Sequence, residues 1–578
     1  MIVYGGREER IDPADRLGRL QAQVDRLNVG LETHDPVVAL LIEWGVLESA
    51  VADALSPEID IESPLLKRFR EGARCVGHLF RLSLQRRSRE VPLWIDRFCG
   101  ILSEIAASPL PPRVVARTPE GYAYYALYPE SYLEAATRFF QEAGPRKAVC
   151  IGLRSIGASL SAVVAAALEG EGCPVQVHTV RPRGHPFDRR LRLSSALEAD
   201  LRRPSGAHYL IVDEGPGLSG SSITCVAQRL SELGIAEERI AFFPSWEPDP
   251  SRFRSKEARA RWERHRKYTV PFNLRFLDLS PNRPLRDLSA GRWRSLFYQT
   301  ESEYPAVHPQ HERRKYLAST PERPGERPLF LKFVGLGRYG TSRRSRAERL
   351  AAAGFAPEPL DLQRGFLSTP FIQGSPLSKG EIDSDLLQTM ARYLAYLSQT
   401  FPVSQCRSFD EIIEMVRVNV GEGLGERWTE AVGRLEPFRT CFETARPIAV
   451  DGRMLPHEWL RTGSGYIKTD GVDHHDDHFF PGCQDIAWDI AGAAIEFGLT
   501  GGEETLLIDR YQSLMDDAAL RTRLPFYKIV YLSYRLGYTH LASETLGPDP
   551  DGARFKRWVV HYGILLQQEL QRLSLIRF

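Results

Sequence analysis

The chain has 578 residues and a mass of 65.3 kDa, a length that predicts three or four domains. Hydrophobic residues make up 43% of it and charged residues 26%, a composition that excludes disordered, collagen-like and fibrous chains. Lys and Arg number 75 against 74 Asp and Glu, so the net charge of +1 gives no global attraction to nucleic acid or membranes, and any anion site must be local.

The sequence also predicts a cytoplasmic protein. It holds no run of about 18 apolar residues, so no membrane span is expected. The N-terminal stretch MIVYGGREERIDPADR lacks the charged-then-apolar pattern of a signal peptide. The eight cysteines are scattered without a CxxC pair, which favours reduced thiols over disulfides or a zinc ribbon. A homo-oligomer is compatible with these features.

Patterning along the chain predicts an α/β protein. Apolar residues at spacings of three and four predict helices first, and strands that alternate with helices then predict a parallel sheet. The basic stretch 251–267 favours a solvated connector helix over a helix that binds nucleic acid. The predicted segments are a helical N-terminal region and candidate hood (1–110), an α/β domain (111–250), connector helices (251–302), a strand-rich lobe (303–377) and a helical lobe (378–578).

The stretch HYLIVDEGPGLSGSSITCVAQRL predicts a phosphate site between a strand and a helix. The buried strand 209–212 ends in Asp213 and Glu214, and a turn rich in Gly and Ser leads into the helix. Backbone N–H groups and hydroxyls at a helix N-terminus bind phosphate, and paired carboxylates accept hydrogen bonds from a ribose diol or bind Mg²⁺ through water. The simpler alternative is a plain turn with an acidic helix start.

This stretch resembles the signature of the type I phosphoribosyltransferases: a hydrophobic strand, two acidic residues and a small-residue loop. The resemblance implies a 5′-phosphate loop made of Gly217, Ser219, Gly220, Ser221 and Ser222. It implies a pyrophosphate-binding group made of Arg154, Ser155, Gly157 and Arg181, from CIGLRSIGASLS and RPRGHPFDRRLRL. It further implies a catalytic group of Asp213, Glu214, Arg183 and His185, and Mg²⁺ that neutralises the leaving pyrophosphate. Trp246 is a candidate to stack on an acceptor base, with core packing as the alternative.

A second pattern surrounds Lys332 in RPLFLKFVGLGRYG. The literal G-x-G-x-x-G after this strand is compatible with a dinucleotide site, with Asp361 as the later acid. Lys332 at mid-strand in a chain with only ten lysines favours a kinase-like site instead. There the lysine binds nucleotide phosphates and pairs with Glu348 on the next helix.

Residues 310–570 resemble the aminoglycoside phosphotransferase and choline kinase family, which implies a two-lobed α+β domain and ATP as substrate. GFLSTPFIQGSPLS matches the strand, hinge and turn into the helical lobe. The family's H-G-D-x-x-x-x-N loop aligns on Gly452, which places Asp451 at the His, Arg453 at the catalytic Asp and Glu458 at the Asn. Asp470 matches the strand-ending metal-binding Asp.

The loop TDGVDHHDDHFFPG predicts a metal site. Its dense imidazoles and carboxylates suit Mn²⁺, Fe²⁺ or Zn²⁺. The alternatives are acids that serve a Mg²⁺–nucleotide and an inert polar loop. The candidate ligands are Asp470, His474, Asp477 and His478. Asp485 and Asp489, in the trailing DIAWDIAG, are expected to be structural acids at a helix start.

Together these patterns predict an enzyme that transfers phosphoribosyl from phosphoribosyl pyrophosphate to an unidentified small acceptor. The kinase-like domain is expected to phosphorylate a related small molecule with ATP and Mg²⁺. The alternative, favoured by the altered catalytic loop, is a regulatory sensor that binds nucleotide without turnover.

Overall fold

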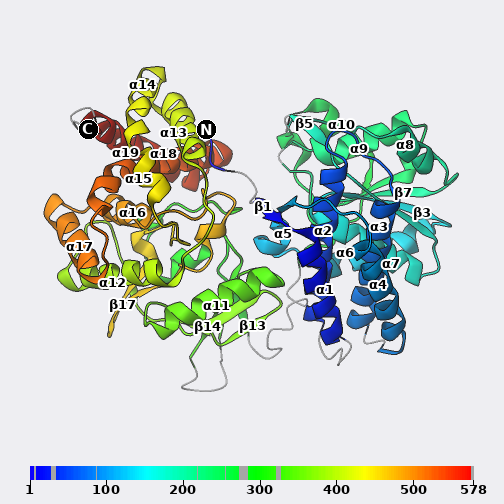
Figure 1. Cartoon of the computed structure of the whole chain (residues 1–578), viewed down its shortest axis with the longest axis horizontal. Coiled ribbons are helices and arrows are strands. Elements are labelled where there is room, and N and C mark those ends of the chain that lie inside the picture. Colours follow the sequence, from blue (N-terminus) through cyan, green and yellow to red (C-terminus); the bar gives the residue numbers. More distant parts are fainter. Residues whose placement is uncertain are drawn as a thin grey trace.

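The computed structural model describes residues 1–4, 8–27, 34–85, 88–185, 187–217, 219–253, 255–272, 284–319 and 327–573. The chain forms two bodies side by side (Figure 1): an α/β half coloured blue to green and a second half coloured green to red. None of the described helices combines the length and the apolar run that a membrane span requires.

The α/β half is built on a five-stranded parallel sheet in the order β4-β3-β7-β8-β9. Its strands are β3 (Ala148–Leu153), β4 (Val175–Val180), β7 (His208–Val212), β8 (Ile240–Phe243) and β9 (Arg266–Lys267). In β3, Val149 and Ile151 enter the core on one face and Cys150 enters the core on the other, as the period of two requires. The predicted parallel sheet is therefore present, and both of its faces are covered.

Helices cover the two faces of this sheet. One layer holds α1 (Pro13–Leu27), α2 (Asp35–Leu55), α3 (Pro64–Leu84), α4 (Val91–Ala106), α6 (Pro129–Ala143) and α7 (Ile156–Gly170). The other holds α8 (Ser195–Arg202), α9 (Ser221–Glu232) and α10 (Lys256–Arg264). At the contact of α3 with α7, a Cβ on Gly77 would lie 2.4 Å from the carbonyl oxygen of Ala162. The segment predicted as a hood is thus a layer of this half.

The basic stretch 251–267 differs from its prediction as a solvated connector. Trp262 of α10 is buried and stacks on Phe242 of β8 with ring centroids 5.4 Å apart, and β9 adds the edge strand. Ala258 and Trp262, four residues apart, form the buried face of α10. The α/β half therefore extends beyond residue 250.

The second half begins with a five-stranded antiparallel sheet in the order β10-β11-β12-β14-β13. Its strands are β10 (Leu285–Asp287), β11 (Lys315–Ala318), β12 (Leu329–Phe333), β13 (Asp361–Gln363) and β14 (Phe366–Pro370), and helix α11 (Arg338–Ala352) follows β12. β10 joins this lobe ahead of the predicted start at 303. An antiparallel sheet excludes the dinucleotide interpretation of the G-x-G-x-x-G stretch, which requires parallel strands. The predicted boundary region 303–327 lies partly outside the described residues.

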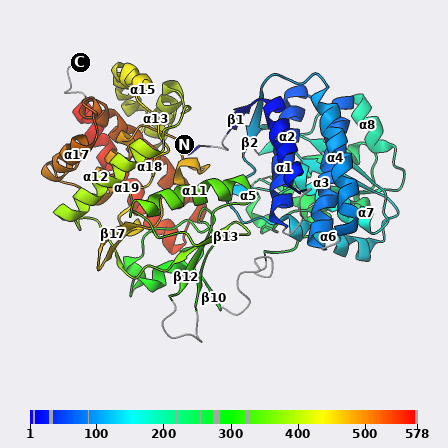
Figure 2. The ribbon, with the colours of Figure 1, turned by 60° about the horizontal axis from the view of Figure 1, so that its bottom comes forward.

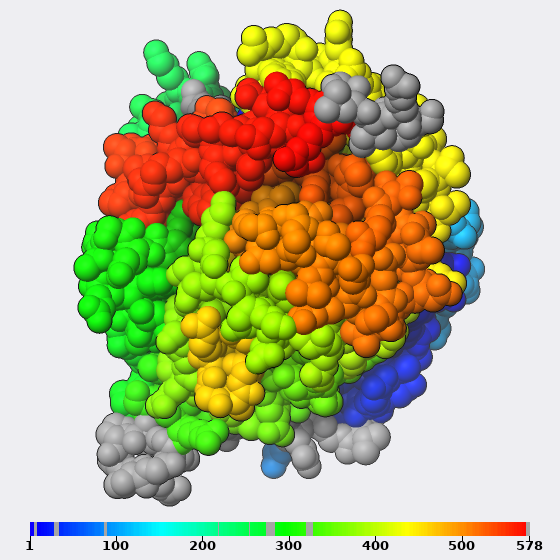
Figure 3. Space-filling model, turned by 90° about the vertical axis from the view of Figure 1, so that its left-hand side faces the viewer, coloured from blue at the N-terminus to red at the C-terminus, as the bar shows by residue number. Residues whose placement is uncertain are grey.

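A helical lobe with a small antiparallel sheet completes this half. It contains α12 (Ser384–Thr400), α13 (Phe409–Leu424), α14 (Thr429–Val432), α15 (Arg439–Thr444), α16 (Ala487–Phe497), α17 (Gly501–Leu514), α18 (Leu520–Leu546) and α19 (Pro550–Leu573). The small sheet is β15 (Ser375–Pro376), β16 (Trp459–Thr462) and β17 (Gly465–Lys468). Figure 3 shows the orange and red C-terminal segments together on one face of this half, next to its green and yellow-green segments.

The N-terminus crosses to this helical lobe, where Figure 2 places it near α13 and α18. The amide of Ile2 donates to Asn419 Oδ1 at 2.7 Å, and Val3 joins the lobe's core. The chain then returns to pair β1 (Glu8–Ile11) with β2 (Val114–Arg117). The first residues therefore tie the two halves together.

Candidate functional site

A cavity of about 250 Å³ lies between the antiparallel sheet and the helical lobe. One part is apolar, lined by Val334, Leu350, Leu367, Phe371, Ile372 and Leu460. The other part is charged, lined by Lys332, Arg453, Glu458, Lys468, Asp470, Asp473, His474 and Asp477. An apolar cleft with converging polar groups is the usual form of a small-molecule site. The structure thus brings most residues predicted from the kinase resemblance to one cavity.

Lys332 lies between two carboxylates. Its Nζ is 2.5 Å from Asp470 Oδ1 and 2.8 Å from Asp473 Oδ1. Burial acts to lower the pKa of Lys332, but these two carboxylates outweigh it and raise that pKa. The site therefore holds a charged ammonium group on the sheet side of the cavity.

The predicted pair of Lys332 with Glu348 is wrong. Glu348 is exposed and pairs with Arg344, Nε to Oε1 at 2.8 Å. Each helix residue turns by about 100°, so when Arg343 and Ala347 face inward, Glu348 faces solvent.

Arg343 and Arg346 of α11 have roles that were not predicted from the sequence. The Nη2 atom of Arg343 lies 2.9 and 3.0 Å from the two Asp476 oxygens. Arg346 donates to the carbonyl oxygens of Gly471 at 2.8 Å and Ala449 at 2.9 Å. Their spacing of three on a buried helix face is a signal for this role, hidden by the abundance of Arg.

Asp489 positions the loop that aligns with the family's catalytic loop. Its carboxylate oxygens accept from the amides of Asp451 at 2.7 Å and Gly452 at 2.8 Å. Asp451 in turn accepts from the Tyr393 hydroxyl at 2.5 Å. Asp485 pairs with Arg523 at 3.2 Å. Both trailing acids therefore have the structural role that the sequence predicts.

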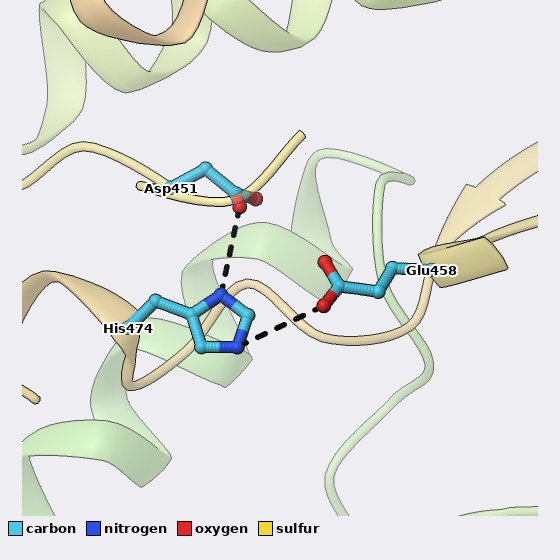
Figure 4. A group of neighbouring side chains, drawn as sticks. All are labelled: Asp451, Glu458 and His474. Atoms are coloured by element: carbon cyan, nitrogen blue, oxygen red, sulfur yellow. Dashed lines mark ion pairs between the residues drawn. The ribbon is translucent and has the colours of Figure 1, made fainter. Parts of the chain in front are cut away.

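His474 lies among three carboxylates, of which Figure 4 shows two, Asp451 and Glu458. Its Nδ1 is 3.8 Å from Asp451 Oδ1, and its Nε2 is 4.0 Å from Glu458 Oε1 and 3.7 Å from Asp470 Oδ1. Burial acts to lower the pKa of His474, but the carboxylates raise it to about 9. The same imidazole belongs to two groups of side chains that could hold a metal ion: Asp451, Glu458 and His474, and Asp470, Asp473 and His474.

The predicted metal ligands divide into two groups. Asp470 and His474 share one cluster with Asp473, whereas Asp477 pairs with Arg313 at 2.9 Å and His478 Nε2 lies 2.7 Å from the Tyr125 hydroxyl. A site with two imidazole ligands is therefore not assembled from this set. The carboxylates of Asp470, Asp473 and Glu458 are hard oxygen donors of the kind that Mg²⁺ prefers.

The second predicted site lies at the carboxyl ends of β3 and β7, where the strand order reverses. Ligands of parallel sheets bind at this point. Asp213 and Glu214 follow β7, and Glu214 Oε2 accepts from the Gly121 amide at 3.1 Å. Burial raises the pKa of Asp213 to about 7 and that of Glu214 to about 8. Trp246 lies beside Gly215 and is 44% exposed, which excludes core packing.

The phosphate loop predicted before α9 forms a tight turn. Gly217 and Gly220 have positive φ, +61° and +69°, and Ser219 Oγ lies 2.9 Å from Ser221 Oγ. Ser222 is half-buried in the first turn of α9. Gly157 is required at the neighbouring turn, since its Cβ would lie 2.5 Å from the Val212 carbonyl oxygen.

The arginines predicted to bind pyrophosphate are already paired with acids. Arg154 lies 3.0 Å from Asp53 and 2.7 Å from Asp60. Arg181 lies 2.5 Å from Asp53, and Arg183 lies 2.9 Å from Asp60. These arginines hold the turn after β3 against α2 and the segment that follows it.

The stretch RPRGHPFDRRLRL, from which the resemblance takes Arg181, Arg183 and His185, contains a two-stranded ribbon, β5 (Arg183–His185) and β6 (Asp188–Arg190). His185 is exposed in it, and Pro186 lies outside the described residues. Ser155 has φ +110°, a strained conformation for a non-glycine residue, and its amide donates to Ser49 Oγ at 3.3 Å.

Helix α5 (Glu120–Ala123) and the two tyrosines after it connect the two sites. The Tyr124 hydroxyl donates to the Asp476 carbonyl oxygen at 2.5 Å, and its ring stacks on His478. The G-x-G-x-x-G turn contacts the same segment: the Leu336 amide donates to the Tyr122 carbonyl oxygen at 3.0 Å. The glycine-rich turn after β12 therefore lies at the contact between the two halves.

No family model matches the chain, and no curated protein matches it. A choline kinase from Streptococcus pneumoniae is 18% identical and covers 45% of this chain and 89% of its own, with a TM-score of 0.33. A choline/ethanolamine kinase family protein from Mesorhizobium loti is 17% identical and covers 46% and 90%, with a TM-score of 0.34. A spectinomycin phosphotransferase in complex with ADP and spectinomycin is 12% identical and covers 52% and 100%, with a TM-score of 0.34. TM-scores below 0.5 leave the assignment to the geometry of the site itself.

Proposed function

We propose that the cavity binds a nucleoside triphosphate with Mg²⁺, and that this half of the chain transfers the terminal phosphoryl group to a small molecule. One observation carries the proposal: buried Lys332 projects from the sheet into the cavity and meets Asp470 and Asp473, directly after β17. A phosphate-binding lysine beside metal-binding acids is the arrangement that phosphoryl transfer requires.

Different walls of the cavity would bind different parts of the nucleotide. The apolar part between Val334, Leu367 and Leu460 suits a nucleobase. Lys332 would bind the phosphates, while Asp470, Asp473 and Glu458 would hold Mg²⁺, which supplies charge neutralisation when bound. Lys468 lies 2.6 Å from Glu458 and 3.3 Å from Asp451, so it holds both carboxylates in place.

In the proposed reaction the acceptor hydroxyl oxygen forms a bond to the terminal phosphorus. The bond from that phosphorus to the bridging oxygen breaks, the nucleoside diphosphate leaves and the hydroxyl proton is released. Because the transition state is loose, positioning and electrostatics contribute more than a strong base. The replacement of the family's catalytic acid by Arg453 is compatible with that chemistry.

The proposal is tested with the intact chain, MgATP and a panel of small hydroxyl compounds. We expect saturable nucleotide binding that requires Mg²⁺, and a diphosphate product with at least one acceptor. Binding without product under every condition would favour the sensor instead. Absence of nucleotide binding would refute both.

A second candidate function belongs to the α/β half. We propose that it binds a phosphorylated ribose such as phosphoribosyl pyrophosphate and transfers the phosphoribosyl group. Two observations favour it: the acid pair Asp213 and Glu214 at the reversal of strand order, and the strained Ser155 in the adjacent turn. The exposed ring of Trp246 beside this pair suits an acceptor base. Pyrophosphate release with candidate acceptors tests it.

The acid pair also predicts a pH-dependent stability. Burial raises the pKa values of Asp213 and Glu214 to about 7 and 8, so the folded state binds more protons than the unfolded one between about pH 4 and pH 8. Stability from this pair is therefore present at low pH and falls as the pH rises. We expect the double variant Asp213→Asn, Glu214→Gln to have an unfolding temperature about 2–4 °C above that of wild type at pH 8. At pH 4 the two unfolding temperatures are expected to be equal.

Thermal unfolding at the two pH values measures this. Equal shifts at both would contradict the account of the acid pair. Phosphoribosyl pyrophosphate binding measured in parallel tests its functional role: the double variant is expected to lose it.

A further inference from the structure

Among the described residues that line the cavity, Arg453 is the cation without a carboxylate oxygen within 4 Å. Six Arg and Lys side chains line this cavity: Arg313, Lys315, Lys332, Arg453, Lys468 and Arg535. The other five each have a carboxylate oxygen within 4 Å: Asp473, Glu312, Asp470, Glu458 and Glu496 respectively. Among the described residues, no carboxylate lies that close to Arg453, and its buried Nε has no hydrogen-bond partner.

The guanidinium of Arg453 keeps its charge in this cavity. The side chain is partly exposed, and burial acts to lower its pKa, but Tyr534, Tyr538, Asp477 and Glu458 outweigh burial and raise that pKa. The cation-π contact with Tyr538, at 5.5 Å from the ring centre, contributes about 1 kcal/mol. A charged guanidinium that lines the cavity without a carboxylate within 4 Å has donors left for an anionic ligand.

Two histidines, His308 and His311, line the same cavity as Arg453. The rings of His308 and His311 stack 3.5 Å apart, and His311 Nδ1 lies 3.4 Å from the Tyr538 hydroxyl. His308 is 3% exposed, and neither of its nitrogens has a hydrogen-bond partner within the described chain. Burial lowers the pKa of His308 to about 4, so at neutral pH its ring is an uncharged donor.

We propose that Arg453 and His308 bind an oxyanion group, a carboxylate or a phosphate, on the second substrate of the proposed phosphotransferase. The inference rests on that function and names its substrate class. A planar guanidinium binds both kinds of oxyanion through two parallel hydrogen bonds. Arg453 rests on Tyr538 of α18, in the wall formed by the helical lobe, whereas Lys332 comes from the sheet. The alignment places Arg453 where a catalytic-loop acid meets the acceptor hydroxyl.

The charge of Arg453 would make the site select acceptors of negative rather than positive charge. A cationic acceptor such as choline would meet a fixed positive charge here, and like charges at contact disfavour binding. An anionic sugar acid or sugar phosphate would neutralise the guanidinium. The acceptor is therefore predicted to be anionic.

The test uses the full chain and three probes: gluconate, ribose 5-phosphate and choline. Each is titrated calorimetrically with and without saturating Mg²⁺ and a non-hydrolysable ATP analogue, in wild type and in Arg453→Met. The matched control is Arg461→Met, an equal charge change on the exposed face of β16. Ribose 5-phosphate is also titrated in the Asp213→Asn, Glu214→Gln background, so that binding at the α/β half does not contribute.

We expect gluconate or ribose 5-phosphate, and not choline, to bind wild type. Arg453→Met is expected to weaken binding of that anion at least tenfold and to leave the affinity for the ATP analogue within twofold. Arg453→Lys is expected to restore part of the affinity, and Arg461→Met to change nothing.

The proposal is overturned if neither anion binds wild type, if choline binds more tightly than both, or if Arg453→Met weakens the ATP analogue instead of the anion. The last result would assign Arg453 to the nucleotide phosphates. Failure of the ATP analogue to bind wild type would refute the proposed phosphotransferase, and titration of the anions without nucleotide would still report on Arg453.

Discussion

Lys332→Met is expected to remove Mg²⁺-dependent nucleotide binding, with an affinity at least 100-fold lower than that of wild type. The variant lacks the charge that meets the phosphates, and it leaves Asp470 and Asp473 buried without their shared cation. Breaking a buried ion pair from one side costs about 3–5 kcal/mol, so the unfolding temperature is expected to fall as well. Calorimetric titration of an ATP analogue and thermal unfolding measure the two effects.

Two variants separate binding from stability. Lys379→Met removes an exposed lysine in the turn after β15 and is expected to change neither quantity. A further change, Asp473→Asn in the Lys332→Met background, removes one of the two carboxylates that lose this cation and is expected to recover part of the stability without nucleotide binding. An affinity for the analogue within threefold of wild type in Lys332→Met would refute the role of this lysine.

Asp489→Asn is expected to lower the free energy of unfolding by about 3 kcal/mol and to remove any phosphotransfer activity. Both carboxylate oxygens accept backbone N–H groups, from Asp451 and Gly452. An amide keeps one acceptor and turns an NH₂ group toward the other N–H, so one buried donor loses its partner. The loop that carries Asp451, Arg453 and Glu458 would then lose its fixed conformation.

Asp516→Asn is the matched control, since Asp516 is exposed near the end of α17. Chemical denaturation measures stability, and product formation measures activity. Full activity in Asp489→Asn would show that the loop is held by other contacts.

Much of the fold follows from local patterns. The apolar run of β7, ended by Asp213 and Glu214, predicts a buried strand and the turn that follows it. The acid at Asp470 follows β17 as the sequence indicates. Alternation of strands and helices over the α/β half predicts its parallel sheet. These features depend on residues close together in the chain, where periodicity is informative.

What the sequence does not show depends on contacts between distant segments. Arg154 and Arg183 look free for a ligand until Asp60 is brought beside them from more than 90 residues away. The inward face of α11 depends on the phase of the helix, so Glu348, predicted to face Lys332, faces solvent, and Arg343, for which no role is predicted, is buried. Exposed and paired arginines are indistinguishable in an Arg-rich chain.

The contact of α5 with both sites is likewise a property of the whole fold. The Gly121 amide donates to Glu214, and three residues later Tyr124 donates to the Asp476 carbonyl oxygen. No motif marks this segment, because its partners lie 93 and 352 residues away.

The central claim is that the cavity around Lys332 binds a Mg²⁺–nucleotide. Calorimetric titration of a non-hydrolysable ATP analogue into the full wild-type chain, with Mg²⁺ and then with a chelator, tests it most directly. We predict saturable binding at one site per chain, lost with the chelator and lost in Lys332→Met. Absence of binding to wild type, or binding unaffected by both the chelator and Lys332→Met, would contradict the claim.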